Sequence, residues 1–184
     1  MHTRTLHRPG SEHDACGVGF VADLRGRRSR DLVEDGLLVL QRLAHRGAVG
    51  ADPDTGDGAG ILLEIPHALL AGELAARGKT LPPEGRYALA MLFLEAGAGV
   101  GPVRTLAIAH GFDVLHTRDV PIDPLQAGPQ ARRSAPRIAQ LILVPREPGA
   151  LGRRLFVLRR AIERADATYV CSLSTRTVVY KGLL

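Results

Sequence analysis

The chain has 184 residues, 45% of them hydrophobic, which is enough for one globular domain with a core of its own. Its net charge of +5 comes from abundant arginine, with only two lysines, no tryptophan and few other aromatic residues. This composition argues against a nucleic-acid-binding protein, because no aromatic stacking platform accompanies the charge. The longest apolar run, residues 88–94, is far too short to cross a bilayer, so we expect no membrane role.

The cysteine content and the first residues indicate a cellular compartment. Only Cys16 and Cys171 are present, and residues 1–15 are polar, without the apolar core of a secretory signal. A disulfide framework is therefore not expected, and we place the protein in a reducing cytosol.

The N-terminal third predicts a strand and a helix. Residues 17–24 read as a strand with Cys16 at its start. A helix is expected to begin at Asp31, with Glu34 three residues later as in a capping box, and to end at Gly47. Its apolar stripe has a period of 3.6 residues and consists of Val33, Leu37, Leu40 and Ala44.

The rest of the chain predicts further strands and helices in alternation. Expected strands are residues 61–65, 87–94 and 138–144, with an extended segment at 113–120. Expected helices are residues 67–77, stopped by Gly78; 102–110, between Pro102 and Gly111; and one whose apolar face is Leu155, Leu158, Ile162 and Ala165. Residues 121–136 read as a proline-rich loop, and residues 168–173 and 176–180 as a closing hairpin across Ser174 and Thr175.

The strands are apolar at consecutive positions, which is expected when both faces of a sheet are covered. This pattern alone favours a doubly wound α/β domain. It does not distinguish that fold from two stacked sheets between helical layers.

Three stretches carry motifs of unusual composition. The first is Cys16-Gly17-Val18-Gly19-Phe20-Val21-Ala22-Asp23, and the second runs from His45 to Gly60 and contains Asp57-Gly58-Ala59-Gly60. The third is Tyr169-Val170-Cys171-Ser172-Leu173-Ser174-Thr175-Arg176-Thr177-Val178-Val179-Tyr180-Lys181-Gly182. In this order, the three stretches resemble the type-2 glutamine amidotransferases, which are N-terminal nucleophile hydrolases, and among them the start of the glutamate synthase large subunits.

The resemblance implies an α+β fold, a four-layer αββα sandwich of the N-terminal nucleophile hydrolase type, which this chain would contain only in part. It also implies that residues 1–15 are a leader removed on maturation and that residues 16–184 are the N-terminal portion of the amidotransferase domain.

Cys16 is the candidate nucleophile. A cysteine with a free α-amino group carries its own general base, because the amine titrates near pH ~8 and the thiol near ~8.5. Removal of the leader would create such an amine. Cys171, inside an apolar strand, reads instead as a structural buried thiol.

Two loop motifs have simpler explanations. His45 and Arg46 are suited to satisfy the last carbonyls of the first helix, with Gly47 as its left-handed cap. The resemblance implies in addition that Arg46 lies beside the glutamine pocket as a candidate substrate-binding residue. Residues 52–60 fit neither a calcium loop nor a phosphate cradle, and the histidines show no metal-binding spacing, so we expect no metal site.

Asparagine is absent from the whole chain. In the family an Asn-Gly pair supplies the oxyanion hole, so the resemblance implies that this group, the FMN and the iron-sulfur cluster belong to a longer parent protein and that this segment needs no cofactor. The implied partners are L-glutamine, the remainder of the synthase chain, and a small electron-donating subunit or ferredoxin. Two alternatives stay open: a non-catalytic regulatory or interaction module with the same fold, and a basic nucleic-acid-binding protein.

Overall fold

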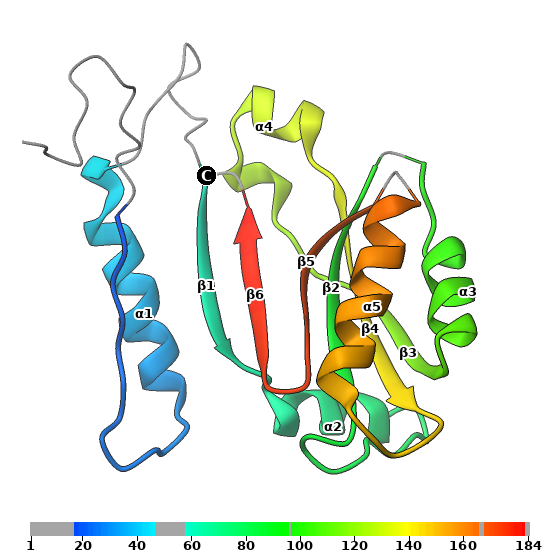
Figure 1. Ribbon diagram of the computed structural model, residues 1–184. Coiled ribbons are helices and arrows are strands. Elements are labelled where there is room, and N and C mark those ends of the chain that lie inside the picture. The colour runs from blue at the N-terminus through cyan, green and yellow to red at the C-terminus, as the bar shows by residue number, and fades with distance from the viewer. Residues whose placement is uncertain (1–16, 47–57, 96, 166–167, 183–184) are drawn as a thin grey trace, which may run out of the picture.

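The computed structural model describes residues 17–46, 58–95, 97–165 and 168–182 (Figure 1). Cys16 and residues 47–57, which include Gly47, lie outside them, as do the side chains of Arg46 and Gln126. The helices are α1 (Arg30–Arg42), α2 (His67–Ala75), α3 (Gly101–Ala109), α4 (Pro129–Ser134) and α5 (Leu151–Arg164), with short 3₁₀ turns at Ala44–Arg46 and Pro124–Gln126. The strands are β1 (Ala59–Glu64), β2 (Ala88–Leu94), β3 (Phe112–Asp119), β4 (Arg137–Pro145), β5 (Thr168–Ser174) and β6 (Thr177–Gly182).

The strands form two antiparallel sheets. One has the order β3-β4-β2-β5, and the other consists of β1 paired with β6. The doubly wound interpretation is therefore wrong, since that fold is built on a parallel sheet. The chain is instead a mixed fold of helices and antiparallel strands, consistent with the α+β class.

A first core lies between the four-stranded sheet and the helices α3 and α5. The strands contribute alternating residues such as Leu92 and Leu141, and the helices contribute Val103, Leu155 and Leu158. All five are at most 4% exposed. The predicted helix face is confirmed for Leu155, Leu158 and Ile162, whereas Ala165 follows the end of α5 and is exposed.

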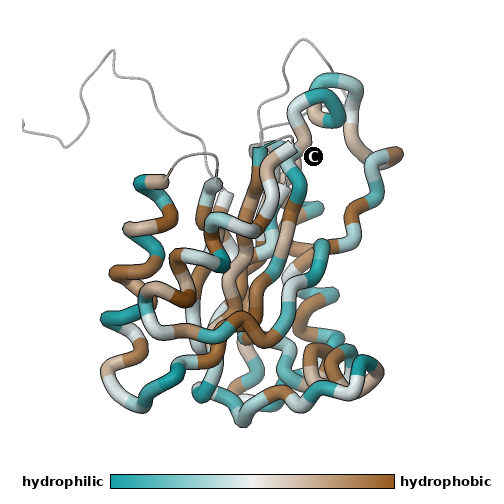
Figure 2. Tube along the Cα trace, turned by 90° about the vertical axis from the view of Figure 1, so that its right-hand side faces the viewer, coloured by the Kyte–Doolittle hydropathy of each residue, from teal (hydrophilic) through white to brown (hydrophobic). Residues whose placement is uncertain are grey.

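A second core lies between the two sheets. Leu89, Met91 and Ile142 of the larger sheet meet Val178 of β6, and α2 closes the lower end with Leu70 and Leu74. Since β2 packs on both faces, its run of buried apolar residues is explained. Apolar residues accordingly dominate the central strands (Figure 2).

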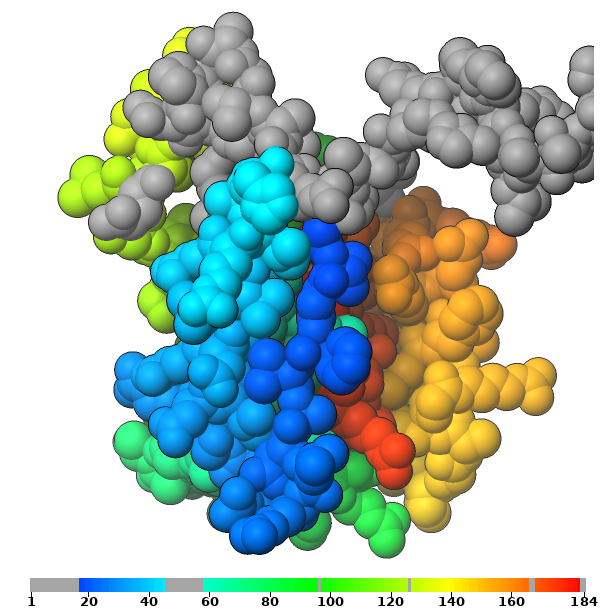
Figure 3. Space-filling model, turned by 90° about the vertical axis from the view of Figure 1, so that its left-hand side faces the viewer, coloured from blue at the N-terminus to red at the C-terminus, as the bar shows by residue number. Residues whose placement is uncertain are grey.

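The N-terminal region covers the outer side of β1 and β6. In Figure 1 the order across the molecule is α1, the two-stranded sheet, the four-stranded sheet, then α5 and α3. Helix α1 approaches β1 at Gly36, where a Cβ would lie 3.0 Å from the Cδ1 of Ile61. Figure 3 shows the segment that precedes α1 lying beside this helix, next to β6.

Residues 17–24 do not form the predicted strand. Among the described residues no strand pairs with them, and the apolar side chains of Val18, Phe20 and Leu24 are almost fully exposed. Alternating apolar residues predict a strand only when a neighbouring strand supplies hydrogen bonds and a surface to pack on.

The first helix also differs at both ends. It begins at Arg30, because Ser29 is its N-cap and accepts a hydrogen bond from the Leu32 amide at 3.3 Å. Glu34 pairs with Arg30 instead of closing a capping box. The α-helix ends at Arg42, and a 3₁₀ turn continues to Arg46.

The predicted closing hairpin is wrong in its pairing. Strands β5 and β6 are adjacent in sequence but belong to different sheets, so the turn between them carries the chain from one sheet to the other. Side chains take the place of the missing ladder: the Ser172 Oγ accepts from the Val179 N–H at 3.2 Å, and the Cys171 Sγ donates to the Val179 carbonyl at 3.7 Å. A helix at α4 and a 3₁₀ turn also interrupt the predicted loop 121–136.

Candidate functional site

The three sequence motifs meet at one end of the molecule, the upper end in Figure 1. The described chain begins there directly after Cys16, α1 ends there, and β1 begins there. The end of β6 lies at the same end. Segments far apart in sequence are therefore brought together where the predicted nucleophile joins the described chain.

The site residues predicted from the sequence are only partly described. Cys16 lies outside the described residues. Arg46 is the last residue of the 3₁₀ turn at this end, and its side chain is not described. The capping interpretation holds for His45, whose Nδ1 lies 2.9 Å from the Arg42 carbonyl oxygen at the end of α1.

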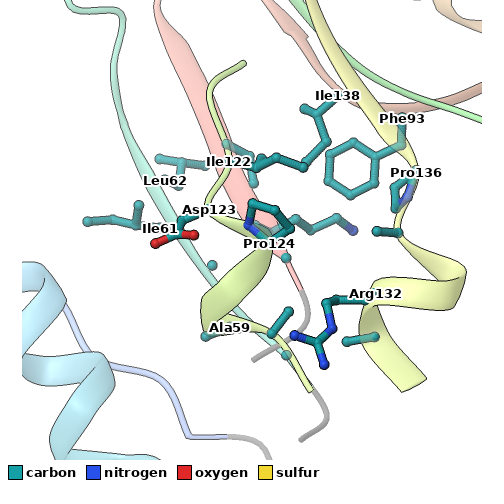
Figure 4. A pocket seen from close by; sticks show the side chains of 18 residues that line it. Ala59, Ile61, Leu62, Phe93, Ile122, Asp123, Pro124, Arg132, Pro136 and Ile138 are labelled. Carbon is teal, nitrogen blue, oxygen red and sulfur yellow. The ribbon is translucent and has the colours of Figure 1, made fainter. Parts of the chain in front are cut away.

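An open pocket of about 780 Å³ lies at this end, between the two-stranded sheet and residues 122–136. It begins beside Gly58, the residue directly before β1, and reaches Gly182 at the end of β6. Most of its lining is apolar. Figure 4 shows the side chains around it, which include Ile61, Leu62, Phe93, Ile122, Pro136 and Ile138.

Three charged residues line the pocket: Asp123, Arg132 and Lys181. The Asp123 carboxylate accepts a hydrogen bond from the Leu125 amide at 3.0 Å, so part of its capacity is used locally. The Lys181 ammonium donates to the Tyr169 hydroxyl at 2.8 Å and lies 4.4 Å from the centre of the Tyr169 ring. The pocket is thus mostly apolar, with one carboxylate and two cationic side chains in its lining, and can accommodate a group that is partly apolar and partly charged.

Sequence reasoning missed these three residues as pocket residues. Lys181 lies inside the third motif, and the adjacent Arg132 and Arg133 are a visible signal, but the prolines of residues 121–136 predict only a loop. Only the tertiary fold brings this segment beside β1.

Cys171 behaves as the sequence predicted for a structural thiol. It lies between the sheets in partial burial, and burial raises the pKa of its thiol despite the opposing charges of Lys181 and Arg159. Its thiol therefore stays protonated and suited to its contact with the Val179 carbonyl.

The arginines at positions 27, 28 and 30 are engaged with carboxylates and do not form a free basic patch. Arg28 holds Glu84 through two hydrogen bonds of 2.6 and 2.8 Å and also contacts Glu64. This ties the segment before α1 to the lower end of the molecule.

No helix in residues 17–46, 58–95, 97–165 and 168–182 is long and apolar enough to span a membrane. In the same ranges, no group of three or more histidine, cysteine, aspartate or glutamate side chains is placed to hold a metal ion.

Comparison with known proteins gives the family. The family described as "Glutamine amidotransferases class-II" matches residues 16–184. The chain belongs to this family. It is 38% identical to the glutamate synthase [NADPH] large chain of Bacillus subtilis over 97% of its own length, but covers only 13% of that protein. It is 39% identical to ferredoxin-dependent glutamate synthase 2 of Synechocystis over 94% of its length, which is 12% of that relative.

The chain thus spans about an eighth of the length of these two curated relatives. A third relative, the NADH glutamate synthase of Saccharomyces cerevisiae, is 36% identical over 98% of this chain and 9% of its own length. The resemblance stated from the three motifs is confirmed at the level of the family and of its glutamate synthase members.

Proposed function

We propose that this chain is the leading part of the glutaminase domain of a glutamate synthase and that Cys16 is its nucleophile. The single observation that carries the proposal is the family match, which begins at Cys16 itself. The meeting of the three motifs at one end of the fold supports it.

In the proposed reaction, the Cys16 thiolate attacks the side-chain amide carbon of glutamine. The α-amine of the same residue takes the thiol proton and passes it to the leaving ammonia. Water then hydrolyses the γ-glutamyl thioester, releases glutamate and restores the thiol. Arg46 is proposed to contact the substrate, since the 3₁₀ turn that it ends lies at the same end of the molecule as the pocket.

The mechanism requires that residues 1–15 be removed. A backbone amide nitrogen at Cys16 cannot act as a base, whereas a free amine can. The proposed mature domain therefore begins at Cys16.

The ammonia is proposed to be transferred to 2-oxoglutarate elsewhere in the parent protein. The names of the relatives include both NADPH and ferredoxin, and a small electron-donating subunit or ferredoxin is the proposed partner. FMN and the iron-sulfur cluster are assigned to the remainder of the synthase, and this segment is proposed to need no cofactor.

The observed order of helix, two sheets and helices is proposed to be part of the four-layer αββα sandwich of N-terminal nucleophile hydrolases. The smaller sheet has only β1 and β6 among the described residues, so the sandwich is proposed to be incomplete in this chain.

The test uses the longer protein encoded with this chain. Replacing Cys16→Ala should abolish glutamine-dependent glutamate synthesis, because the thioester cannot form, and should leave ammonia-dependent synthesis largely intact. Cys171→Ala is the matched control and should keep both activities. N-terminal sequencing of the active protein should begin Cys-Gly-Val-Gly. Retained glutamine hydrolysis in the Cys16 variant would exclude this nucleophile, and wild-type protein without any glutaminase activity would favour the non-catalytic module.

A further inference from the structure

The segment that joins Cys16 to α1 lies against this helix without belonging to a sheet. Residues 17–22 are all exposed, and no strand pairs with them among the described residues. Gly19 approaches α1 closely, since a Cβ there would lie 2.5 Å from the Cγ1 of Val39. The position of the segment along the helix therefore depends on what holds its other end.

That other end is a tight turn closed by Asp23. The Asp23 carboxylate accepts hydrogen bonds from the Arg25 and Arg27 amides at 2.7 and 3.3 Å, and from the Arg27 guanidinium at 2.8 and 3.1 Å. Gly26 has a φ of +68° and donates to the Asp23 carbonyl at 2.9 Å, so the chain reverses its direction here. The hydrogen bonds from Arg27 hold the pKa of Asp23 below its usual range, which keeps the carboxylate charged at neutral pH.

Arg28 ties this turn to the body of the fold. Its guanidinium donates two hydrogen bonds of 2.6 and 2.8 Å to Glu84, in the loop between α2 and β2, and also contacts Glu64, the last residue of β1. Ser29, the next residue, caps α1. One side chain thus joins the turn, the end of β1 and the loop before β2.

The segment has little slack with which to absorb a movement of this turn. Helix α1 has 13 residues and rises roughly 20 Å. Residues 17–23, which run alongside it towards the lower end of the molecule in Figure 1, span at most about 25 Å when fully extended. A displacement of the turn is therefore passed on to Gly17, to which Cys16 is bonded.

We propose that Arg28 is a positioning residue for the Cys16 nucleophile. By binding Glu84 and Glu64 it fixes the turn, and through the extended segment it sets where the mature N-terminus meets the substrate. This role rests on the proposed function of Cys16. Arg28 itself does not line the pocket, which lies at the opposite end of the molecule.

The energetics of the segment explain why an exposed ion pair matters here. All three side chains of the cluster are about half exposed, and such pairs contribute little to the stability of a whole protein. A segment that pairs with no strand, however, opens locally at a low cost. The contacts of Arg28 are therefore a large part of what holds residues 17–23 in place.

The first test exchanges charges in the longer protein encoded with this chain. Arg28→Glu should lower the kcat of glutamine-dependent synthesis on the order of 10-fold with little change in KM, because a small misplacement of a reacting group is costly. Ammonia-dependent synthesis should be unchanged. Adding Glu84→Arg again places one guanidinium between two carboxylates and should restore most of the lost kcat. Arg25→Glu is the matched control, an exposed arginine of the same turn whose guanidinium has no partner among the described residues.

The second test reads the turn without reference to glutamine. Trypsin should release the peptide that ends at Arg27 on the order of 10-fold faster from the Arg28→Glu variant than from the double variant, because cleavage requires the turn to open. Both proteins have the same sequence around the cleaved bond, so the comparison reports the clamp alone.

Three results would overturn the proposal. The first is an Arg28→Glu variant with the same kcat as the Arg25→Glu control. The second is a double variant that recovers neither kcat nor resistance to trypsin. The third is a turn that opens faster while kcat stays unchanged, since the clamp would then hold the segment without positioning the nucleophile. Failure of the proposed function differs from all of these, because Cys16→Ala would retain glutamine hydrolysis while the trypsin comparison still reported the clamp.

Discussion

Gln140 is a buried polar residue that links the two sheets by a hydrogen bond. It is fully buried in β4, and its amide nitrogen donates to the Tyr180 hydroxyl of β6 at 3.0 Å. Its Oε1 is buried without a hydrogen-bond partner among the described residues. The Oε1 of Gln140 already lacks a hydrogen bond. The bond from its amide nitrogen to Tyr180 is therefore what offsets the cost of burying this polar side chain.

Tyr180→Phe should therefore destabilise the protein by about 1–3 kcal/mol, the usual cost of leaving a buried polar group unsatisfied. Replacing both partners, Gln140→Met with Tyr180→Phe, should cost less than the tyrosine change alone, because no orphaned amide remains. Urea denaturation of the four proteins measures the coupling. Strictly additive effects would show that the hydrogen bond contributes nothing.

His116 predicts a pH dependence of stability. Burial lowers the pKa of its imidazole, and the charges of Arg77, Lys79 and Arg118 lower it further against the smaller opposing effect of Glu73. The unfolded chain, with an ordinary pKa of about 6.5, then binds the proton more readily than the folded chain.

The stability contributed by neutral His116 is thus fully present above about pH 6.5 and is lost as the pH falls towards the folded-state pKa. We expect the urea midpoint to drop between pH 7.5 and pH 5.5, and His116→Gln to reduce that drop. An identical drop in the variant would assign the effect to other groups.

At the scale of the elements, local sequence patterns predicted most of the helices and strands. The helices α2 and α3 and the strands β2, β3 and β4 lie within two residues of their expected bounds, because their apolar periods and their glycine and proline boundaries are local. Gly78 and Gly111 both have positive φ, at 67° and 79°, as expected for residues that end helices.

The sequence-based predictions were wrong where the pairing of strands depends on residues far apart in the chain. Residues 168–180 have the alternation and the short turn of a hairpin, but no local signal says that β6 pairs with β1. Residues 17–24 have the composition of a strand without a partner strand in the described chain. In the same way, nothing local connects residues 122–136 to the pocket beside β1.

Gly111 provides a prediction at this scale. Its φ is +79°, and a Cβ there would lie 2.8 Å from the guanidinium of Arg154, which itself donates to the Gly111 carbonyl at 2.8 Å. Gly111→Ala should destabilise the turn between α3 and β3 by more than about 1 kcal/mol. Gly72→Ala is the control: inside α2 with open space around it, it should stabilise by about 0.5–1 kcal/mol. Thermal unfolding of both variants compares them, and equal shifts would contradict the assignment.

For the whole molecule, periodicity alone could not choose between a parallel and an antiparallel architecture, since both bury strands on two faces. The resemblance carried by the three motifs favoured two stacked, largely antiparallel sheets, and the two sheets of the structure are antiparallel. The reactive centre could be predicted only through the resemblance, because a single cysteine before a glycine has no chemistry that spacing reveals.

The 184-residue chain alone, even with Cys16 exposed as residue one, should not hydrolyse glutamine at a useful rate. It contains no asparagine for an Asn-Gly oxyanion hole, and each such donor typically contributes ~10²–10³ in rate. The open edge of β1 and the exposed Val18, Phe20 and Leu24 should also favour aggregation. Residues 16–184 should therefore be expressed alone, with ammonia release from glutamine and the elution volume on gel filtration measured on one preparation. A monodisperse monomer with the glutaminase rate of the longer protein would show that this segment is a complete catalytic domain.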